Sequence, residues 1–84
     1  MQMGDVAVAF KIMLKSQDVN INSVKNEIIS KLHPKEINIQ DLAFGIKVIK
    51  ALFIIPDSSG INELEDKIKD IEGVGEVETE SLTL

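Results

Sequence analysis

Few residues of this sequence could take part in covalent or metal chemistry, and their spacing does not assemble a site. His33 is the single histidine, and Pro34 follows it directly. A general base needs a partner that orients it, whereas a proline at this place indicates the end of a helix. A histidine at a helix C-terminus is mildly favoured by the helix dipole. The chain has no cysteine, so it offers no thiolate nucleophile, disulfide or thiolate metal site.

Carboxylates are plentiful in the last third of the chain, where paired acids could do acid–base work or bind a hard cation. They are Glu63, Glu65, Asp66, Asp70, Glu72, Glu76, Glu78 and Glu80. Their positions fall on the polar face of a predicted helix and on an edge strand, which is typical of a solvated surface. Residues 57–60 lack the spacing of a calcium loop, and Gly73 and Gly75 do not form a phosphate-binding fingerprint. We therefore predict no catalytic residue, no metal, no cofactor and no enzymatic activity.

Composition excludes further classes. The 84 residues carry a net charge of −5, which argues against nucleic acid as a direct partner because phosphate binding draws on clustered Lys and Arg. The chain has three Phe and no Trp or Tyr, so it lacks the aromatic platform on which RNA bases stack. No stretch approaches the roughly 20 apolar residues of a membrane span, and no signal peptide opens the chain. We expect a cytoplasmic protein without a membrane partner.

The hydrophobic pattern changes between a period of two and a helical period along the chain. Alternation predicts strands over Val6–Leu14, 37–40, 46–55 and 77–84. Apolar residues at helical spacing predict a helix over Ile21–Leu32, with Asn20 as its N-cap, and a second helix that begins at Ile61. Gly73 is expected to end the second helix in a left-handed conformation.

This order of elements, βαββαβ, predicts one α+β domain over residues 1–84 with a ferredoxin-like sandwich fold. Right-handed crossovers place both helices on one face of a four-stranded antiparallel sheet. The most apolar strands, the first and third, are expected at its centre. Lys11 and Lys50 mark the open face. It is also expected to carry the apolar residues Ala7, Ala9, Met13, Val48, Leu52 and Ile54. An apolar sheet face is typical of an interface, either with a second copy or with a different protein.

Phe44 stands in the turn 41–45, between the second and third strands, and directly before Gly45. A phenylalanine in a turn is more often a core residue than a binding anchor. Gly45 frees the backbone at this point, so the turn could instead hold the ring outward, where its apolar area would suit a protein contact. Both interpretations remain open from the sequence.

Several stretches together resemble the archaeal elongation factor 1-beta family and the C-terminal exchange domain of its eukaryotic counterparts. They are Met3-Gly4-Asp5-Val6, Leu42-Ala43-Phe44-Gly45-Ile46-Lys47, Ile54-Ile55-Pro56-Asp57 and Ile71-Glu72-Gly73-Val74. The resemblance spans essentially the whole chain. It implies a guanine-nucleotide exchange factor that promotes GDP release from elongation factor 1-alpha, the GTPase that delivers aminoacyl-tRNA.

The resemblance also implies which residues bind that GTPase. In the family, the loop that holds the Phe-Gly-Ile-Lys stretch and the C-terminal end reach the GTPase near its magnesium site. These positions correspond here to Phe44, Gly45, Ile46 and Lys47, and to Thr83 and Leu84. The family often has a basic residue next to its C-terminus, where this chain has Thr83. A role in which a cation displaces magnesium is therefore not carried over.

Two other functions fit the same order of elements. One is a small-molecule-binding regulatory module of the ACT type, whose ligand site lies in the first strand–helix loop of a dimer. Here that loop, residues 15–18, lacks the glycine that such a site often uses. The other is a structural dimerisation module, for which the partner would be a second copy of the chain.

Overall fold

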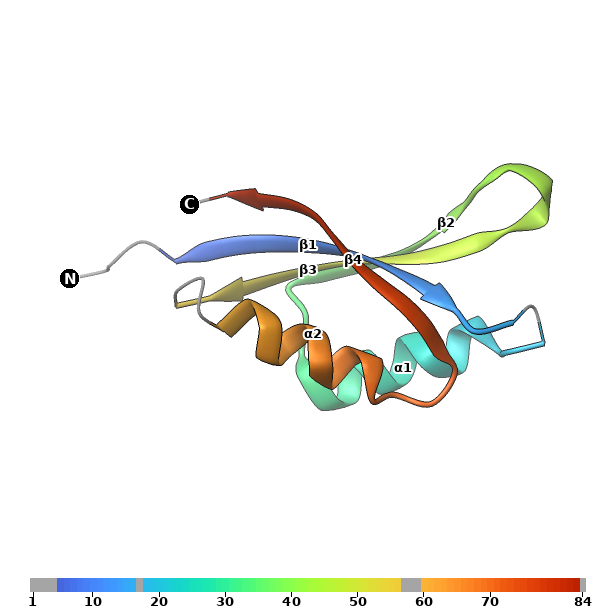
Figure 1. Cartoon of the computed structure of the whole chain (residues 1–84), viewed down its shortest axis with the longest axis horizontal. Helices are drawn as coiled ribbons and strands as arrows, with labels where there is room; N and C mark the ends of the chain where they lie inside the picture. Colours follow the sequence, from blue (N-terminus) through green and yellow to red (C-terminus); the bar gives the residue numbers. More distant parts are fainter. Residues whose placement is uncertain (1–4, 17, 57–59, 84) are drawn as a thin grey trace.

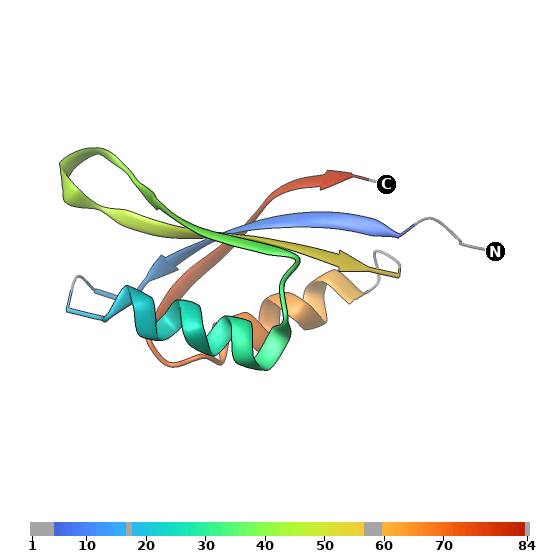
Figure 2. The ribbon, with the colours of Figure 1, turned by 180° about the vertical axis from the view of Figure 1, so that it is seen from behind.

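The computed structural model describes residues 5–16, 18–56 and 60–83. Its strands are β1 (Val6–Leu14), β2 (Glu36–Asp41), β3 (Lys47–Ile55) and β4 (Val74–Thr83), and its helices are α1 (Ile21–Leu32) and α2 (Ile61–Lys69). The strands form one antiparallel sheet in the order β2-β3-β1-β4. Both helices lie on the same face of this sheet (Figures 1 and 2). The predicted α+β, ferredoxin-like sandwich is confirmed, with the first and third strands at its centre.

The core lies between the sheet and the two helices, where the alternation of the strands predicted it. Val8, Phe10 and Ile12 of β1 are fully buried. Phe10 meets Phe53 of β3 edge to face, with ring centroids 5.8 Å apart, a favourable aromatic geometry. The helices close the core with Val24 and Ile28 of α1 and Ile68 of α2.

The open face of the sheet is crossed by a row of polar residues, one from each strand. In register order from β2 to β4 they are Asn38, Lys50, Lys11 and Glu78. Lys11 and Lys50 face each other directly, and like charges in this position repel. The positive charge of Lys50 is compensated by the Glu80 carboxylate, whose Oε1 lies 2.5 Å from Lys50 Nζ. Val48, which was expected to be part of an apolar surface here, is fully buried. The open face is therefore not a continuous apolar interface.

Local signals at the ends of α1 are as predicted. The Asn20 side chain accepts hydrogen bonds from the backbone N–H groups of Asn22 and Ser23, at 3.0 and 3.2 Å, and so caps the first turn. His33 ends the helix in the left-handed conformation, with φ 54° and ψ 62°, and its backbone N–H donates to the Ile29 carbonyl. The helix-end interpretation of this histidine is confirmed.

The segment between α2 and β4 differs from the prediction. The helix ends at Lys69, with Asp70 as its C-cap, so Gly73 does not cap it. Gly73 instead lies at φ 96° in a turn that the Val74 N–H closes on the Ile71 carbonyl. A Cβ at Gly73 would stand 2.8 Å from Val19 Cγ1, so both the backbone conformation and the space require glycine.

The last strand also begins earlier than predicted, at Val74 rather than at residue 77. Val74 pairs with Leu14 across a register shift next to Met13. Gly75 permits this pairing, because a Cβ there would stand 2.9 Å from the backbone of Leu14. The close approach of two backbones therefore extends β4 by three residues.

Candidate protein-binding site

The β2–β3 hairpin ends in a tight turn built by Ala43, Phe44 and Gly45 (the 3-10 segment η1, Ala43–Gly45). Phe44 has φ 64° and ψ 29°, and Gly45 has φ 76°. The Ile46 N–H donates to the Ala43 carbonyl at 3.3 Å, which closes the turn. Two successive residues with positive φ inside such a hydrogen bond are the geometry of a type I′ turn. That turn type joins neighbouring strands without splaying them.

Phe44 occupies the first of the two central positions of this turn, where Asn, Asp or Gly is preferred. A bulky residue with positive φ is an outlier, and the left-handed region costs a non-glycine residue roughly 1–2 kcal/mol. No atom lies within 4 Å of a Cβ placed on Gly45. At this position glycine is therefore needed for its backbone conformation and not for space.

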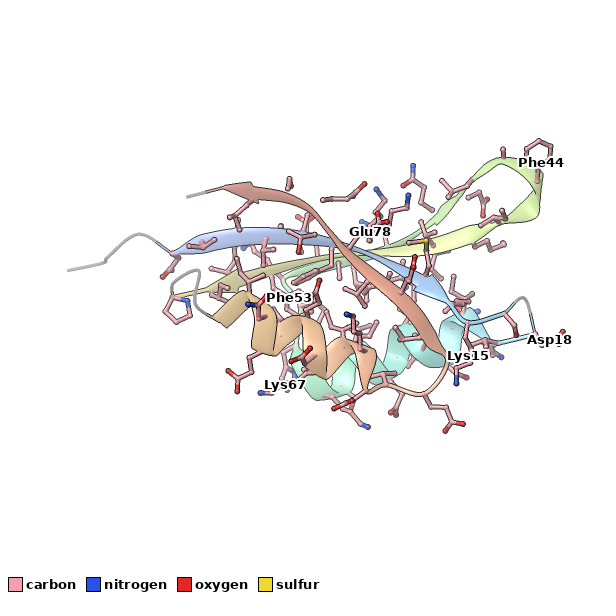
Figure 3. All side chains as sticks on the ribbon, in the orientation of Figure 1. Lys15, Asp18, Phe44, Phe53, Lys67 and Glu78 are labelled. Atoms are coloured by element: carbon pink, nitrogen blue, oxygen red, sulfur yellow. The ribbon has the colours of Figure 1, made fainter. Side chains whose placement is uncertain are left out.

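The tip of this hairpin carries three of the six large hydrophobic side chains that are exposed among the described residues. Phe44 is 95% exposed, Ile46 is 46% exposed and Leu42 is 37% exposed. Figure 3 shows Phe44 at the outer end of the hairpin, away from both helices and the core. The interpretation of Phe44 as a core residue is wrong. We refer below to residues 42–46 as the hairpin tip.

Lys47 lies directly behind the hairpin tip, at the start of β3. Its ammonium Nζ is 3.4 Å from the Asp41 carboxylate, the residue that it faces across the ladder. Both side chains are largely exposed, so this ion pair contributes little to stability. The charges of Lys47 and Asp41 cancel, so the apolar tip is bordered by polar side chains that carry no net charge. Protein-binding surfaces commonly have such a polar rim around an apolar centre.

The structure does not bring the C-terminal residues to the hairpin tip. Thr83 pairs with Ala7, at the end of the sheet where β1 begins, and Leu84 lies outside the described residues. Figure 1 shows the end of β4 and the β2–β3 hairpin at opposite ends of the long axis of the molecule, which measures 45 Å. Of the six residues expected to bind the partner, Phe44, Gly45, Ile46 and Lys47 are contiguous, and Thr83 is remote from them.

Sequence reasoning missed a groove beside the hairpin. It lies between the hairpin and the segment that connects β1 to α1, and it has a volume of about 540 Å³. The lining residues are Met13, Leu14, Ser16, Val19, Ile21, Gly45, Ile46 and Lys47. No local sequence pattern predicts this groove, because its walls come from segments more than 20 residues apart in the sequence.

The described residues contain no group of three or more His, Cys, Asp or Glu side chains that could hold a metal ion. None of the helices in the described part of the chain is long and apolar enough to cross a membrane. The structure instead combines a packed α+β sandwich with an apolar hairpin tip held in solvent. An apolar tip held in solvent is typical of a domain that binds another protein.

Residues 7–84 match the EF-1 guanine nucleotide exchange domain family. The chain therefore belongs to this family, and its function is guanine-nucleotide exchange for elongation factor 1-alpha. Elongation factor 1-beta of Thermoplasma acidophilum is 37% identical, over 98% of this chain and 99% of its own length. Elongation factor 1-beta of Pyrobaculum aerophilum is 33% identical, over 90% of this chain and 89% of its own.

Solved structures with the same fold include the ACT domain of GTP pyrophosphokinase from Chlorobium tepidum. Its crystal structure has a TM-score of 0.64 and covers 92% of this chain and all of that chain. Its solution structure has a TM-score of 0.70 and covers 92% of this chain and 88% of that chain. Both are 22% identical in sequence. This likeness concerns the fold alone, so an ACT-type regulatory function gains no support from it.

Proposed function

We propose that this chain promotes GDP release by binding elongation factor 1-alpha through its hairpin tip, with the Phe44 ring as the principal anchor. The observation that carries the proposal is the 95% exposure of Phe44 on a turn whose backbone conformation disfavours phenylalanine. An aromatic side chain in solvent gains nothing for the fold. Inserted into a pocket of a partner, a ring of this size buries about 150–250 Å².

Exchange follows from differential affinity and needs no covalent step. A protein that binds the nucleotide-free GTPase more tightly than the GDP-bound form must, by thermodynamic linkage, weaken the binding of GDP by the same factor. A factor of one thousand corresponds to about 4 kcal/mol of difference between the two complexes. One well-buried anchor supplies about 2 kcal/mol or more, so contacts beyond Phe44 must contribute.

A second contact is proposed at the far end of the molecule, from Thr83 and Leu84. Because β4 ends at the opposite end of the 45 Å long axis from the hairpin, the two contacts would fall on well-separated parts of the GTPase. In this arrangement only one of them would lie near the magnesium site, whereas the resemblance implied that place for both. The sandwich between them would act as a rigid spacer. Removal of residues 83 and 84 should lower the exchange rate while leaving the thermal midpoint within a few degrees.

The direct test is the release of fluorescently labelled GDP from purified elongation factor 1-alpha. Phe44→Ala should lose most of the exchange activity of the wild-type chain. Ile29→Ala is the matched control, because Ile29 is also a large apolar residue that is 40% exposed but lies on α1. Exchange that survives Phe44→Ala intact, or that falls equally with Ile29→Ala, would contradict the proposal. We further propose that the chain acts in the cytoplasm and binds neither RNA nor membrane directly.

A further inference from the structure

The groove beside the hairpin shares three of its eight lining residues with the hairpin and its base, namely Gly45, Ile46 and Lys47. A protein that contacts the exposed Ile46 side chain therefore contacts a residue that lines the groove. The remaining walls come from the end of β1 and from the segment that leads into α1. The groove is continuous with the surface that carries Phe44, and both belong to the same end of the molecule.

The lining chemistry limits what the groove can hold. Met13, Leu14, Val19, Ile21 and Ile46 supply its apolar walls, and Ser16 and Lys47 are the polar side chains among the lining residues. Lys47 is already paired with Asp41. No described side-chain nitrogen or oxygen atom is buried without a hydrogen-bond partner, so none demands a polar ligand group. Covering a groove with such walls by an apolar group is favourable, because it removes apolar surface from water.

We infer that the groove receives an aliphatic side chain of the GTPase, of the size of leucine or methionine, while Phe44 inserts into the GTPase. This inference rests on the proposed function, because it assumes that the hairpin tip is the contact surface. The volume of about 540 Å³ exceeds what one side chain needs, so part of the neighbouring backbone would enter with it. The resulting interface interlocks, with a projecting ring and an adjacent depression on the same protein.

An interlocking contact explains how a small tip can bind specifically. A single projecting ring fits many apolar pockets, whereas a ring and a depression at a fixed spacing fit few surfaces. The β2–β3 ladder holds the hairpin in place, with paired residues from Glu36–Leu52 to Asp41–Lys47. The spacing between the ring and the groove is therefore set by the sheet.

Groove-filling substitutions test the inference. Ser16 is exposed in the segment after β1 and lines the groove, and its hydroxyl oxygen accepts an exposed hydrogen bond from the Asp18 N–H. Ser16→Trp places a large ring in the groove without changing charge. Asn22→Trp is the matched control, because Asn22 is exposed on α1, next to the lining residue Ile21, but does not line the groove. We expect Ser16→Trp to weaken binding to nucleotide-free elongation factor 1-alpha by roughly tenfold or more, and Asn22→Trp to change it less than twofold.

The two proposals fail in distinguishable ways. If Phe44→Ala loses affinity while Ser16→Trp keeps it, the hairpin is the contact surface and the groove inference is wrong. If both variants keep full affinity, both proposals are wrong. If Ser16→Trp keeps GTPase affinity but abolishes a concentration-dependent self-association in sedimentation, the occupant is a second copy and the inference is overturned.

Methyl NMR gives a second readout that needs no substitution. On addition of unlabelled GTPase to the methyl-labelled chain, the resonances of Met13, Val19 and Ile21 should shift. The Ile61 methyl group at the start of α2 does not line the groove and should serve as the reference. Shifts at the hairpin without shifts at Met13 and Ile21 would contradict an occupied groove even if Ser16→Trp proved unstable.

Discussion

Substitution of Phe44 separates the contribution of this residue to binding from its contribution to folding. The structure places a 95% exposed ring on a backbone with φ 64°. Removing an exposed ring leaves no cavity, so Phe44→Ala should change the free energy of unfolding by less than about 0.5 kcal/mol, as for other surface substitutions. A buried phenylalanine would cost roughly 3–5 kcal/mol on the same change. The expected midpoint shift is therefore a few degrees at most.

Phe44→Asn sharpens the test, because it should stabilise the fold. Asparagine tolerates the left-handed region, and it is favoured at this position of a type I′ turn. It should recover about half of the roughly 1–2 kcal/mol that a left-handed conformation costs other residues. For a domain of this size, a gain of about 0.5–1 kcal/mol raises the midpoint by about 2–8 °C. Activity should move in the opposite direction, since the anchor is lost.

Two measurements on the same variants decide the outcome. Unfolding is followed by far-ultraviolet circular dichroism, because the chain has no Trp or Tyr to report by fluorescence. Exchange is followed by release of labelled GDP from elongation factor 1-alpha at several concentrations of the variant. Loss of an anchor worth about 2 kcal/mol corresponds to about thirtyfold weaker binding. Both Phe44→Ala and Phe44→Asn should show it.

The reasoning would be refuted by either of two results. A midpoint that falls by tens of degrees in Phe44→Ala would mean that the ring packs against the fold. Undiminished exchange in the stabilised Phe44→Asn variant would mean that the ring does not contact the GTPase.

Three further predictions follow from the same structure. Gly73→Ala should lower the free energy of unfolding, measured by denaturant titration, by about 2 kcal/mol or more. The new Cβ would stand 2.8 Å from Val19 Cγ1, on a backbone with a φ of 96°. An unchanged midpoint would show that the turn relaxes freely. His33→Gln should leave the GDP-release rate nearly unchanged, because His33 is the exposed C-cap of α1. A large loss of this rate in a variant of unchanged stability would show that His33 is a functional residue. Single-stranded RNA should not bind at physiological salt in a gel-shift titration, given the net charge of −5, and sub-micromolar binding would overturn this.

The fold could be predicted from the sequence because its signals are local. The alternation of Val6, Val8, Phe10 and Ile12 places one face of β1 in the core, and all four are buried. The N-cap at Asn20 and the helix end at His33 also depend on residues within four positions. Such signals fix the type of each element and the face that it buries, and these decide the layers of a small domain.

The features that the sequence did not reveal arise from contacts between distant segments. The early start of β4 depends on Gly75 meeting the backbone of Leu14. Burial of Val48 on the open face arises among strands that neighbour it only in the folded sheet. The groove beside the hairpin is lined both by Gly45 and by Ser16 and Val19, which are distant in sequence. The periodicity of the sequence does not predict these contacts, because each one depends on how the sheet twists and on which backbone segments come close.

Phe44 shows why sequence reasoning stopped between two interpretations of one residue. A core phenylalanine and an exposed anchor have the same local composition, and only the backbone conformation at the turn separates them. The type I′ turn directs the ring into solvent, at a conformational cost that the fold does not recover through packing. Where a residue departs from the preference of its turn without any compensating contact inside the chain, the compensation is expected in a complex. A turn that already fixes the backbone at Phe44 would also spare such a complex the entropy of ordering this backbone. We therefore relate the stability that the fold loses by having phenylalanine in this turn to the binding affinity that we propose for its ring.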